Sequence, residues 1–370
     1  MTTGSLTDRA LGRATLARQH LLRRSDVDPS TMIEHLVGLQ AQAPLPPYYA
    51  LWTRLRDFRP DMLAALVESR AVVRIALMRG TVFAVSAADA HALRSWVQPV
   101  LDRYAGTGPA GSSGERGLDR AEFEASVGEI LAARAESPAD LGRLLAERFP
   151  GHDPAALARA ARCLLPLVQV PPRGLWGRSG RPRLAHLDVW VGPPPDGLVT
   201  PETFVLRYLA AFGPASVRDA QAWCGLTRLT EIFERLRPRL ATFRDERGVE
   251  LFDLPDAPRP DPSTPAPVRI LAPFDNVLLS HADRTRFVAE EHRTRIVSKN
   301  GIVPAAVLVD GTVAGSARVT TDEKTGTVEV TSWRTIIASD RSALEAEGMR
   351  LLDFAAPGAG DHRVHFAPPS

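Results

Sequence analysis

Two glutamines separated by a single residue, Gln40 and Gln42, are the side chains of this chain whose types and spacing could do chemistry. Apolar residues before them have helical spacing as far as Leu39, and three prolines between positions 44 and 47 prevent a helix from continuing. If the segment between is extended, residues i and i+2 point to the same side, and the two amides form a paired site. Each amide can donate and accept hydrogen bonds, so the pair could hold water or a ligand. The alternative is that both side chains cap the end of the helix through backbone hydrogen bonds.

The signatures of nucleotide, hydrolase and metal chemistry are absent from the sequence. There is no Walker A pattern, GxSxG elbow, HExxH or zinc-deaminase motif. Gly106, Gly108 and Gly111 match the spacing GxGxxG, but no strand pattern precedes them, so we expect no dinucleotide site. His281 and Asp283 lie close together in the sequence without further ligands nearby, which predicts a structural pair rather than a metal site. No metal and no cofactor is expected.

The composition is typical of a folded protein with several domains. Hydrophobic residues make up 44% and charged residues 24% of the 370, and the net charge of +2 does not by itself indicate a polyanion partner. Lysine occurs only at Lys299 and Lys324, and codon bias in a GC-rich genome is the simplest reason for the many arginines. Cys163 and Cys224 are expected as buried thiols. The sequence contains no apolar run of about 18 residues and no signal-type stretch, so we expect a cytoplasmic protein with no membrane partner.

Helix and hairpin patterns predict one small unit that occurs three times. Residues 200–213, 216–225 and 227–240 have helical spacing, and alternation around Arg247 and Gly248 then predicts a hairpin. Three helices followed by a hairpin form a winged-helix unit, whose third helix usually enters a DNA groove. Residues 119–192 and 8–104 repeat this order, the latter ending in a long helix over 87–104.

Breaks near position 110, at 191–197 and at 256–267 divide the chain into four domains. We expect winged-helix domains at residues 1–110, which include the two glutamines, at 117–196 and at 199–256. From residue 268 onward, short alternating segments and turn signals predict a small antiparallel β-barrel at 266–370, with a helix over 338–356 packed on it. The fold class is therefore α+β: three tandem winged-helix (helix-turn-helix) domains followed by a small antiparallel β-barrel.

Motifs from all four domains, taken in order, resemble one known family. They are VGLQAQAP with the two glutamines, VVRIALMRGTVF, PPRGLWGRSG, FGPASVRDAQAWCGL, LAPFDNVLLSHADRTR and NGIVPAAVLVDGTVAG. Together they are similar to the AlkZ/YcaQ-type winged-helix DNA glycosylases. The resemblance implies a C-shaped protein that binds double-stranded DNA, with Gln40 and Gln42 at the two catalytic positions. Glutamine at the second position resembles the AlkZ branch, which unhooks azinomycin-type interstrand crosslinks in self-resistance, whereas the YcaQ branch has an acid there.

The chemistry that this resemblance implies is hydrolysis of an N-glycosidic bond in base excision repair. Alkylation at N7 gives a purine a positive charge and makes it a good leaving group, so two neutral amides need only position water. Lyase activity would need an amine. Lys299 lies beside the Asn300-Gly301 turn, which in the resemblance belongs to a hairpin that approaches DNA, so we expect it to contact phosphate instead. We therefore predict a monofunctional glycosylase for N7-alkylated purines, crosslinked ones included, and no excision of unmodified bases.

Basic residues near the predicted hairpins and recognition helices are expected to contact the DNA backbone. These candidates are Arg178, Arg181, Arg284, Arg286 and Lys299, together with Asn300. The aromatic residues nearest the glutamines that could stack on a base are Tyr48, Tyr49 and Trp52, and core packing explains Trp52 at least as well.

Two other functions remain open from the sequence. A winged-helix transcriptional regulator would also bind DNA, but operator readers are usually symmetric dimers of one such unit. A drug-sequestering resistance protein would bind the alkylating agent itself. For the glycosylase we expect a monomer, associated with the nucleoid, whose partner is double-stranded DNA carrying alkylated or crosslinked purines.

Overall fold

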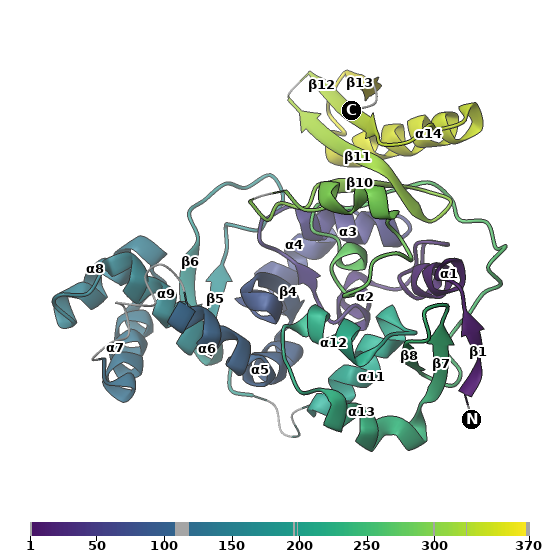
Figure 1. Cartoon of the computed structure of the whole chain (residues 1–370). Helices are drawn as coiled ribbons and strands as arrows, with labels where there is room; N and C mark the ends of the chain where they lie inside the picture. The colour runs from purple at the N-terminus through teal and green to yellow at the C-terminus, as the bar shows by residue number, and fades with distance from the viewer. Residues whose placement is uncertain are drawn as a thin grey trace.

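The computed structural model describes residues 2–107, 118–194, 197, 199–298, 300–322 and 324–367. These residues adopt a mixed α+β fold with three sheets, which confirms the predicted class. Figure 1 shows a central body from which a helical bundle and the C-terminal sheet project in different directions. None of the helices in the described ranges is long and apolar enough to cross a membrane.

The central sheet joins the first two predicted domains. Its strands are β2 Leu39–Gln40, β3 Val72–Ala76, β4 Val82–Ser86, β5 Leu167–Val170 and β6 Arg183–His186, in the order β2-β4-β3-β5-β6. Each strand is antiparallel to its neighbours. Strands β3 and β5 come from different predicted domains, yet Arg74 pairs with Gln169 and Ile75 with Val168. The wings of the first two units therefore lie in one continuous sheet, and the site described below sits at its β2 edge.

The helices of residues 29–107 pack around this sheet. They are α2 Pro29–His35, α3 Pro46–Arg54, α4 Pro60–Glu68, α5 Ala87–Trp96 and α6 Gln98–Thr107, and the 3-10 turn η1 spans Met78–Gly80. The prediction of one helix over 87–104 is wrong. Pro99 lacks an N–H and would clash with the preceding turn of a continuous helix, so the chain bends at Val97 between α5 and α6. Helix α4 is absent from our prediction, although Pro60 followed by Asp61 is a common helix start.

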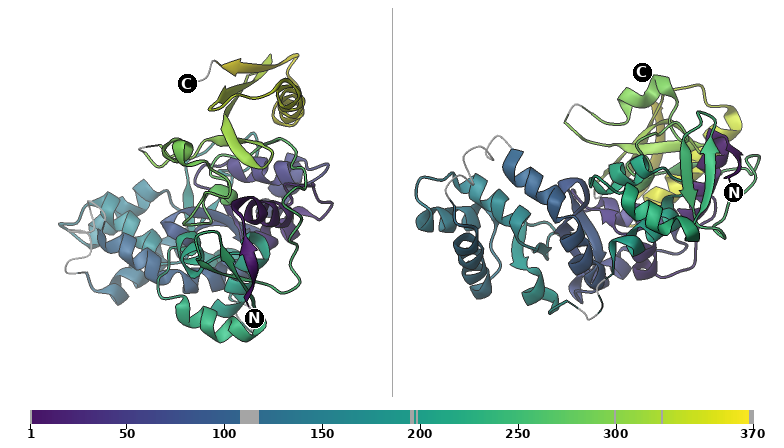
Figure 2. Two further views of the ribbon diagram at one scale, coloured as in Figure 1. Left: turned by 45° about the vertical axis from the view of Figure 1, so that its right-hand side comes forward. Right: turned by 60° about the horizontal axis from the view of Figure 1, so that its bottom comes forward.

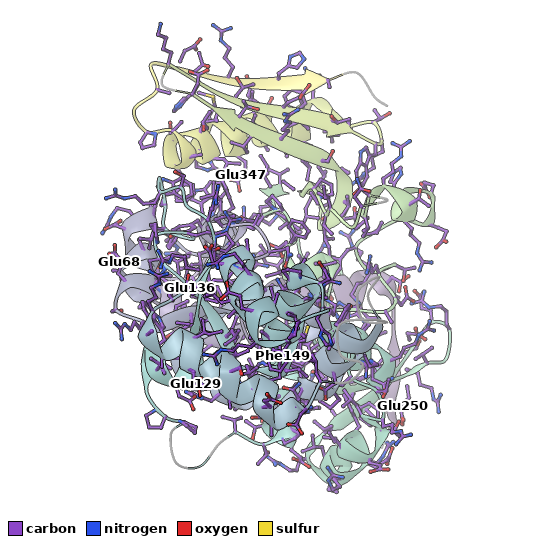
Figure 3. All side chains as sticks on the ribbon, turned by 90° about the vertical axis from the view of Figure 1, so that its left-hand side faces the viewer. Glu68, Glu129, Glu136, Phe149, Glu250 and Glu347 are labelled. Carbon is purple, nitrogen blue, oxygen red and sulfur yellow. The ribbon has the colours of Figure 1, made fainter. Side chains whose placement is uncertain are left out.

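Residues 120–164 form the predicted three-helix bundle. Its helices are α7 Arg120–Ala133, α8 Pro138–Arg148 and α9 Pro154–Leu164, and their N-cap side chains, Asp119, Ser137 and Asp153, accept hydrogen bonds from the first turn. Phe123 and Phe149 pack in the core of this bundle, where Figure 3 labels Phe149. The segment expected to complete the wing is instead the short helix α10, Leu187–Val191.

The third unit has the predicted three helices and hairpin. They are α11 Pro201–Phe212, α12 Val217–Cys224, α13 Thr230–Leu236, the 3-10 turn η2 Arg237–Arg239, β7 Ala241–Asp245 and β8 Glu250–Asp253. Ser216 and Asp219 form a capping box at the start of α12, and Gly225 ends that helix in the left-handed conformation. The strand β1, Thr2–Leu6, pairs in parallel with β7 and completes a three-stranded sheet.

The N-terminal helix α1, Asp8–Arg18, packs against the third unit, although we expected it to belong to the first one. Both terminal nitrogens of Arg18 donate to the carboxylate of Asp253, at 2.6 and 2.8 Å, and both side chains are buried. The hydroxyl of Thr15 donates to the carbonyl oxygen of Phe212. These contacts place the chain's start beside β8 and α11.

The C-terminal segment forms a five-stranded sheet in the described residues. Its elements are β9 Arg269–Ile270, the 3-10 turns η3 Asn276–Leu278 and η4 Glu290–Arg295, β10 Ala305–Val309, β11 Thr312–Thr321, β12 Thr325–Ser332, α14 Ala338–Ala355 and β13 Asp361–Ala367. The helix predicted over 338–356 is confirmed. Leu344, Leu351 and Leu352 of α14 pack with Val328 and Val330, and Figure 2 shows the helix against one side of the sheet.

The prediction of an antiparallel β-barrel is wrong. Strand β13 is parallel to β12, because the chain crosses over through α14 before it returns to the sheet. The order β13-β12-β11-β10-β9 leaves β13 and the two-residue β9 at opposite edges, so the sheet is open within the described residues.

A buried carboxylate connects this sheet to the central body. Glu347 of α14 is fully buried, lies at the junction in Figure 3, and accepts a hydrogen bond of 2.8 Å from Nη2 of Arg24. Arg54 of α3 likewise donates from both terminal nitrogens to Asp275, with both side chains fully buried. Because breaking a buried pair leaves an unpaired charge, these contacts hold the two parts together.

Candidate active site

The strand that carries the first glutamine starts from a tight turn. Helix α2 ends at His35, earlier than the predicted Leu39, and Val37 and Gly38 then adopt positive φ angles of 54° and 93°. A Cβ on Gly38 would lie 2.4 Å from Cγ1 of Val85, so only glycine fits there. The turn directs the chain into β2, which pairs with β4, and the N–H of Ala41 continues the pairing by donating to the carbonyl of Val82 at 2.7 Å. The extended conformation predicted at Gln40 is confirmed.

The side chain of Gln40 is held by a hydrogen bond to its amide oxygen. Its side chain is 7% exposed, and Oε1 accepts a hydrogen bond of 2.8 Å from Nη2 of Arg79. Burial lowers the pKa of Arg79 to about 10, and the positive charge of Arg284 acts in the same direction. Within the described ranges Nε2 of Gln40 makes no hydrogen bond, so this donor is left for a ligand.

Gln42 is exposed and is held by the backbone. Its Oε1 accepts from the N–H of Val82 at 3.1 Å, which again leaves Nε2 without a partner in the described part of the chain. Both amide oxygens therefore bond to the η1–β4 region. Neither side chain bonds to the end of α2, so the helix-capping alternative is wrong.

The residue between the glutamines is fixed as well. Nη2 of Arg74 donates to the carbonyl oxygen of Ala41 at 2.9 Å, and Nη1 donates to the carbonyl of Arg173 at 3.3 Å. Arg74 is buried, and burial together with the nearby charge of Arg173 lowers its pKa to about 10. Its hydrogen bonds in the described structure go to carbonyl oxygens rather than carboxylates, so Arg74 serves to connect the Gln-Ala-Gln segment to the loop between β5 and β6.

Tyr48 connects helix α3 to the same loop between β5 and β6. Its hydroxyl donates to the carbonyl of Gly174 at 2.8 Å and accepts from the N–H of Trp176 at 3.1 Å, and burial raises its pKa to about 12. The rings of Tyr48, Tyr49 and Trp52 pack with Trp176 and Phe354 at centroid distances of 5.1 to 5.9 Å. Tyr48 and Trp52 are buried in this cluster, so neither can stack on a base without rearrangement.

An apolar groove of about 600 Å³ begins at the residue after Gln42. It runs from Ala43, Leu45 and Tyr49 to the loop before β10 and to the face of β11. Leu45 and Ile302, at 39% and 55% exposure, lie at its rim and are among the most exposed large apolar side chains described. The groove can accommodate an apolar group adjacent to the paired amides.

The residues predicted to contact DNA are placed differently from one another. Arg178, Arg181 and Asn300 are exposed. Arg284 is half-buried and near enough to Arg79 to lower the pKa of Arg79, and its side chain makes no hydrogen bond or ion pair in the described residues. Arg286 is buried, and its Nη1 donates to the carbonyl of Pro214 at 2.9 Å, so its side chain is committed to the interior. Lys299 lies outside the described residues.

The His281 and Asp283 side chains do not bond to each other. Nε2 of His281 bonds to the carbonyl of Phe212 at 3.0 Å, whereas Asp283 accepts from Thr285. No group of three or more histidine, cysteine or carboxylate side chains suited to a metal ion occurs among the residues described.

Two residues that hold the glutamine segment, Arg74 and Arg79, are missing from our sequence predictions. Both interrupt the apolar run VVRIALMRG, where a charged side chain must find an internal partner. That pattern is the signal that could have identified them, because the glutamine segment supplies the acceptors: the carbonyl oxygen of Ala41 for Arg74 and the amide oxygen of Gln40 for Arg79.

A helix-turn-helix unit such as the one formed by α11, α12 and α13 is typical of proteins that bind DNA. The chain matches the family described as DNA glycosylase AlkZ-like over residues 33–354. It belongs to this family of DNA glycosylases, whose substrate is DNA.

One solved structure supports the fold. The Streptomyces sahachiroi DNA glycosylase AlkZ superposes with a TM-score of 0.75 over 98% of this chain and 100% of that chain, at 20% sequence identity. No curated protein matches the chain by sequence.

Proposed function

We propose that this protein is a monofunctional DNA glycosylase that hydrolyses the N-glycosidic bond of N7-alkylated purines, and that Gln40 and Gln42 position the attacking water. The observation that carries the proposal is the pair of amides fixed through their oxygens beside β4, with both nitrogens free in the described structure. We further propose, from the resemblance, that the substrates include interstrand crosslinks of an azinomycin-type natural product, and that the protein acts as a monomer without a cofactor.

The amides are suited to a cationic lesion. Each Oε1 accepts one hydrogen bond, so its second lone pair can accept from water while a nearby N–H donates to the sugar or the water. The water oxygen bonds to C1′ as the bond from C1′ to N9 breaks, the base leaves neutral with the bonding electrons, and one proton of the water passes to solvent. Positioning is enough because the leaving group already carries its positive charge.

The apolar groove supports the proposal that the substrates include lesions with a large apolar substituent. It starts at Ala43, so a substituent on a base bound at Gln42 could enter it without displacing the aromatic cluster. Methylated purines would leave the groove unfilled. We therefore expect the protein to excise bulky adducts at least as well as 7-methylguanine.

The charges on α13, the third helix of the third unit, disfavour the alternative of a transcriptional regulator, because in a regulator this helix would enter the DNA groove. The exposed face of α13 carries Glu231 and Glu234, and its Arg235 is paired with Glu202 at 2.5 Å. Negative and paired side chains on this helix oppose insertion into a groove lined by phosphates.

The test is excision from duplexes that carry either 7-methylguanine or an azinomycin-type crosslink, followed by alkaline cleavage of abasic sites. Wild type and Gln98→Ala, whose amide bonds to Asp102 on α6, should both produce strand breaks. The double variant Gln40→Ala, Gln42→Ala should reduce them by about 100-fold or more. A borohydride-trapped complex with DNA would contradict the absence of lyase activity, and sequence-specific binding of undamaged DNA without breaks would support a regulator. Tight binding of the drug without DNA would support sequestration.

A further inference from the structure

The turn between β3 and β4 carries a cation that the proposed water-positioning step does not use. Arg79 lies in η1 with φ 55° and ψ 19°, and Gly80 follows with φ 69°. A Cβ on Gly80 would lie 2.5 Å from Cδ2 of Tyr104. The ring of Tyr104 in α6 therefore lies directly against the turn that carries Arg79.

Arg79 contacts two separate parts of the molecule. Its Nη2 donates to Oε1 of Gln40 at 2.8 Å, and its Nη1 donates to the carbonyl of Trp223 in the last turn of α12. Its guanidinium lies over the ring of Phe83, 5.4 Å from the centroid. A cation at a helix C-terminus is favourable because unbonded carbonyls and the helix dipole make that end negative.

The chemistry of this contact determines how Gln40 is oriented. A guanidinium has donors and no acceptor, so only the oxygen of the Gln40 amide can face it. The amide nitrogen is therefore forced to the other side, where it has no partner among the described residues. No carboxylate pairs with Arg79 in the described chain, so its contacts are to neutral oxygens.

We propose that Arg79 is a positioning residue for Gln40. It selects the one amide orientation that presents the nitrogen to the substrate, and it couples that orientation to the end of α12 in the third unit. Gln42 is independent of this contact, because the backbone of Val82 holds its oxygen. The role in catalysis rests on the proposed function, whereas the orientation of the amide does not.

A double-mutant cycle tests the catalytic part, using single-turnover excision of 7-methylguanine at saturating DNA. Arg79→Met should lower the excision rate by about 10-fold or more in wild type and in the Gln42→Ala background, with DNA affinity changed by less than about 3-fold. In the Gln40→Ala background the same change should have less than about a 2-fold effect, because the residue it acts through is gone. The proposal would be overturned if Arg79→Met lowered the excision rate equally in wild type and in the Gln40→Ala background. It would also be overturned if Arg79→Met weakened only DNA binding.

Arg79→Lys covers the case in which Arg79→Met does not fold. Lysine retains the charge but has one donor nitrogen in place of the two that a planar guanidinium directs at Gln40 and Trp223, so it should hold Gln40 less well and lower the excision rate with unchanged DNA affinity. Full activity of this variant would contradict the need for a guanidinium.

The side-chain amide signals of the protein labelled with ¹⁵N-glutamine give a readout that does not depend on activity. The Gln40 signal, identified by its loss in Gln40→Ala, should shift in Arg79→Met and stay in place in the control Arg178→Met, while the Gln42 signal is unchanged in both. An unshifted Gln40 signal would refute the contact. If wild type excises no lesion and the shift is seen, the proposed function fails while the orientation of Gln40 stands.

Discussion

At the scale of single residues, the two glutamines have unequal environments. Gln40 is buried against a guanidinium, whereas Gln42 is exposed and bonded to one backbone N–H. The i, i+2 spacing predicts a possible pair of amides from the prolines that stop the helix and from strand geometry, and the family resemblance then assigns the pair to catalysis. Their partners could not be inferred from that spacing, because Arg79 and Val82 are about 40 residues away in the sequence.

This difference predicts unequal costs of removing the two side chains. Gln40→Ala leaves a largely buried cation without its acceptor, so the free energy of unfolding should fall by about 1.5–3 kcal/mol. Gln42→Ala exposes the Val82 N–H to water, which can replace the lost acceptor, and should cost less than about 1 kcal/mol. Urea unfolding of the two single variants measures both values. Equal costs would show that Arg79 finds another acceptor when Gln40 is truncated.

At the scale of elements, local signals predicted the helices with clear starts and ends. Thr200, Ser216 and Ser137 are N-cap residues of α11, α12 and α8, and residues of this type before a helical pattern are a local start signal. The wrong prediction of an antiparallel barrel has its physical origin in tertiary context. The crossover through α14 decides that β13 runs parallel to β12, and no local pattern in residues 361–367 records the direction of its neighbour.

The η1 turn offers a test at this scale, because its glycine is required by both conformation and space. Gly80→Ala must accept a φ of 69° and a contact of 2.5 Å with Tyr104, so it should lower the free energy of unfolding by about 1–3 kcal/mol. Gly128 of α7 is the matched control: it has no atom within 4 Å of an added Cβ, and Gly128→Ala should stabilise by about 0.5–1 kcal/mol. Urea unfolding compares the two. A neutral Gly80→Ala would mean that the turn is not fixed by the α6 ring.

At the scale of the whole molecule, the sequence predicts repeating units but not how they join. The pairing of β3 with β5 and the packing of α1 on the third unit connect residues about 100 and 235 positions apart, and such contacts have no periodic signature in the sequence. The segment that carries the two glutamines also depends on contacts between units. Arg74 and Tyr48 tie it to the second unit, and Arg79 ties it to the third.

The pH dependence of the stability of the whole fold can be predicted from two histidines in its interior, His281 and His20. Burial lowers the pKa of His281 to about 3, with the nearby charge of Arg286 acting in the same direction against the opposing effect of Asp219. Burial also lowers the pKa of His20 to about 4, and the neighbouring His35 contributes. His281 lies between the third unit and the C-terminal segment, where its ring nitrogen bonds to Phe212.

Whether the free energy of unfolding rises or falls with pH depends on whether the folded or the unfolded state binds more protons. In the unfolded chain these histidines take up a proton near pH 6.5, and in the folded protein they do so only near pH 3 to 4, so unfolding gains protons in between. The free energy of unfolding should therefore fall as the pH drops below 6.5, by at most about 1.4 kcal/mol per pH unit for each buried histidine. The carboxylates with lowered pKa values contribute only below their unfolded pKa of about 4, so urea unfolding at about pH 7 and pH 5 isolates the histidines. His281→Gln keeps a donor for Phe212 and removes one titrating group, so its stability should change less between the two pH values than that of wild type. An equal change in both proteins would show that His281 is protonated in the folded state as readily as in the unfolded chain.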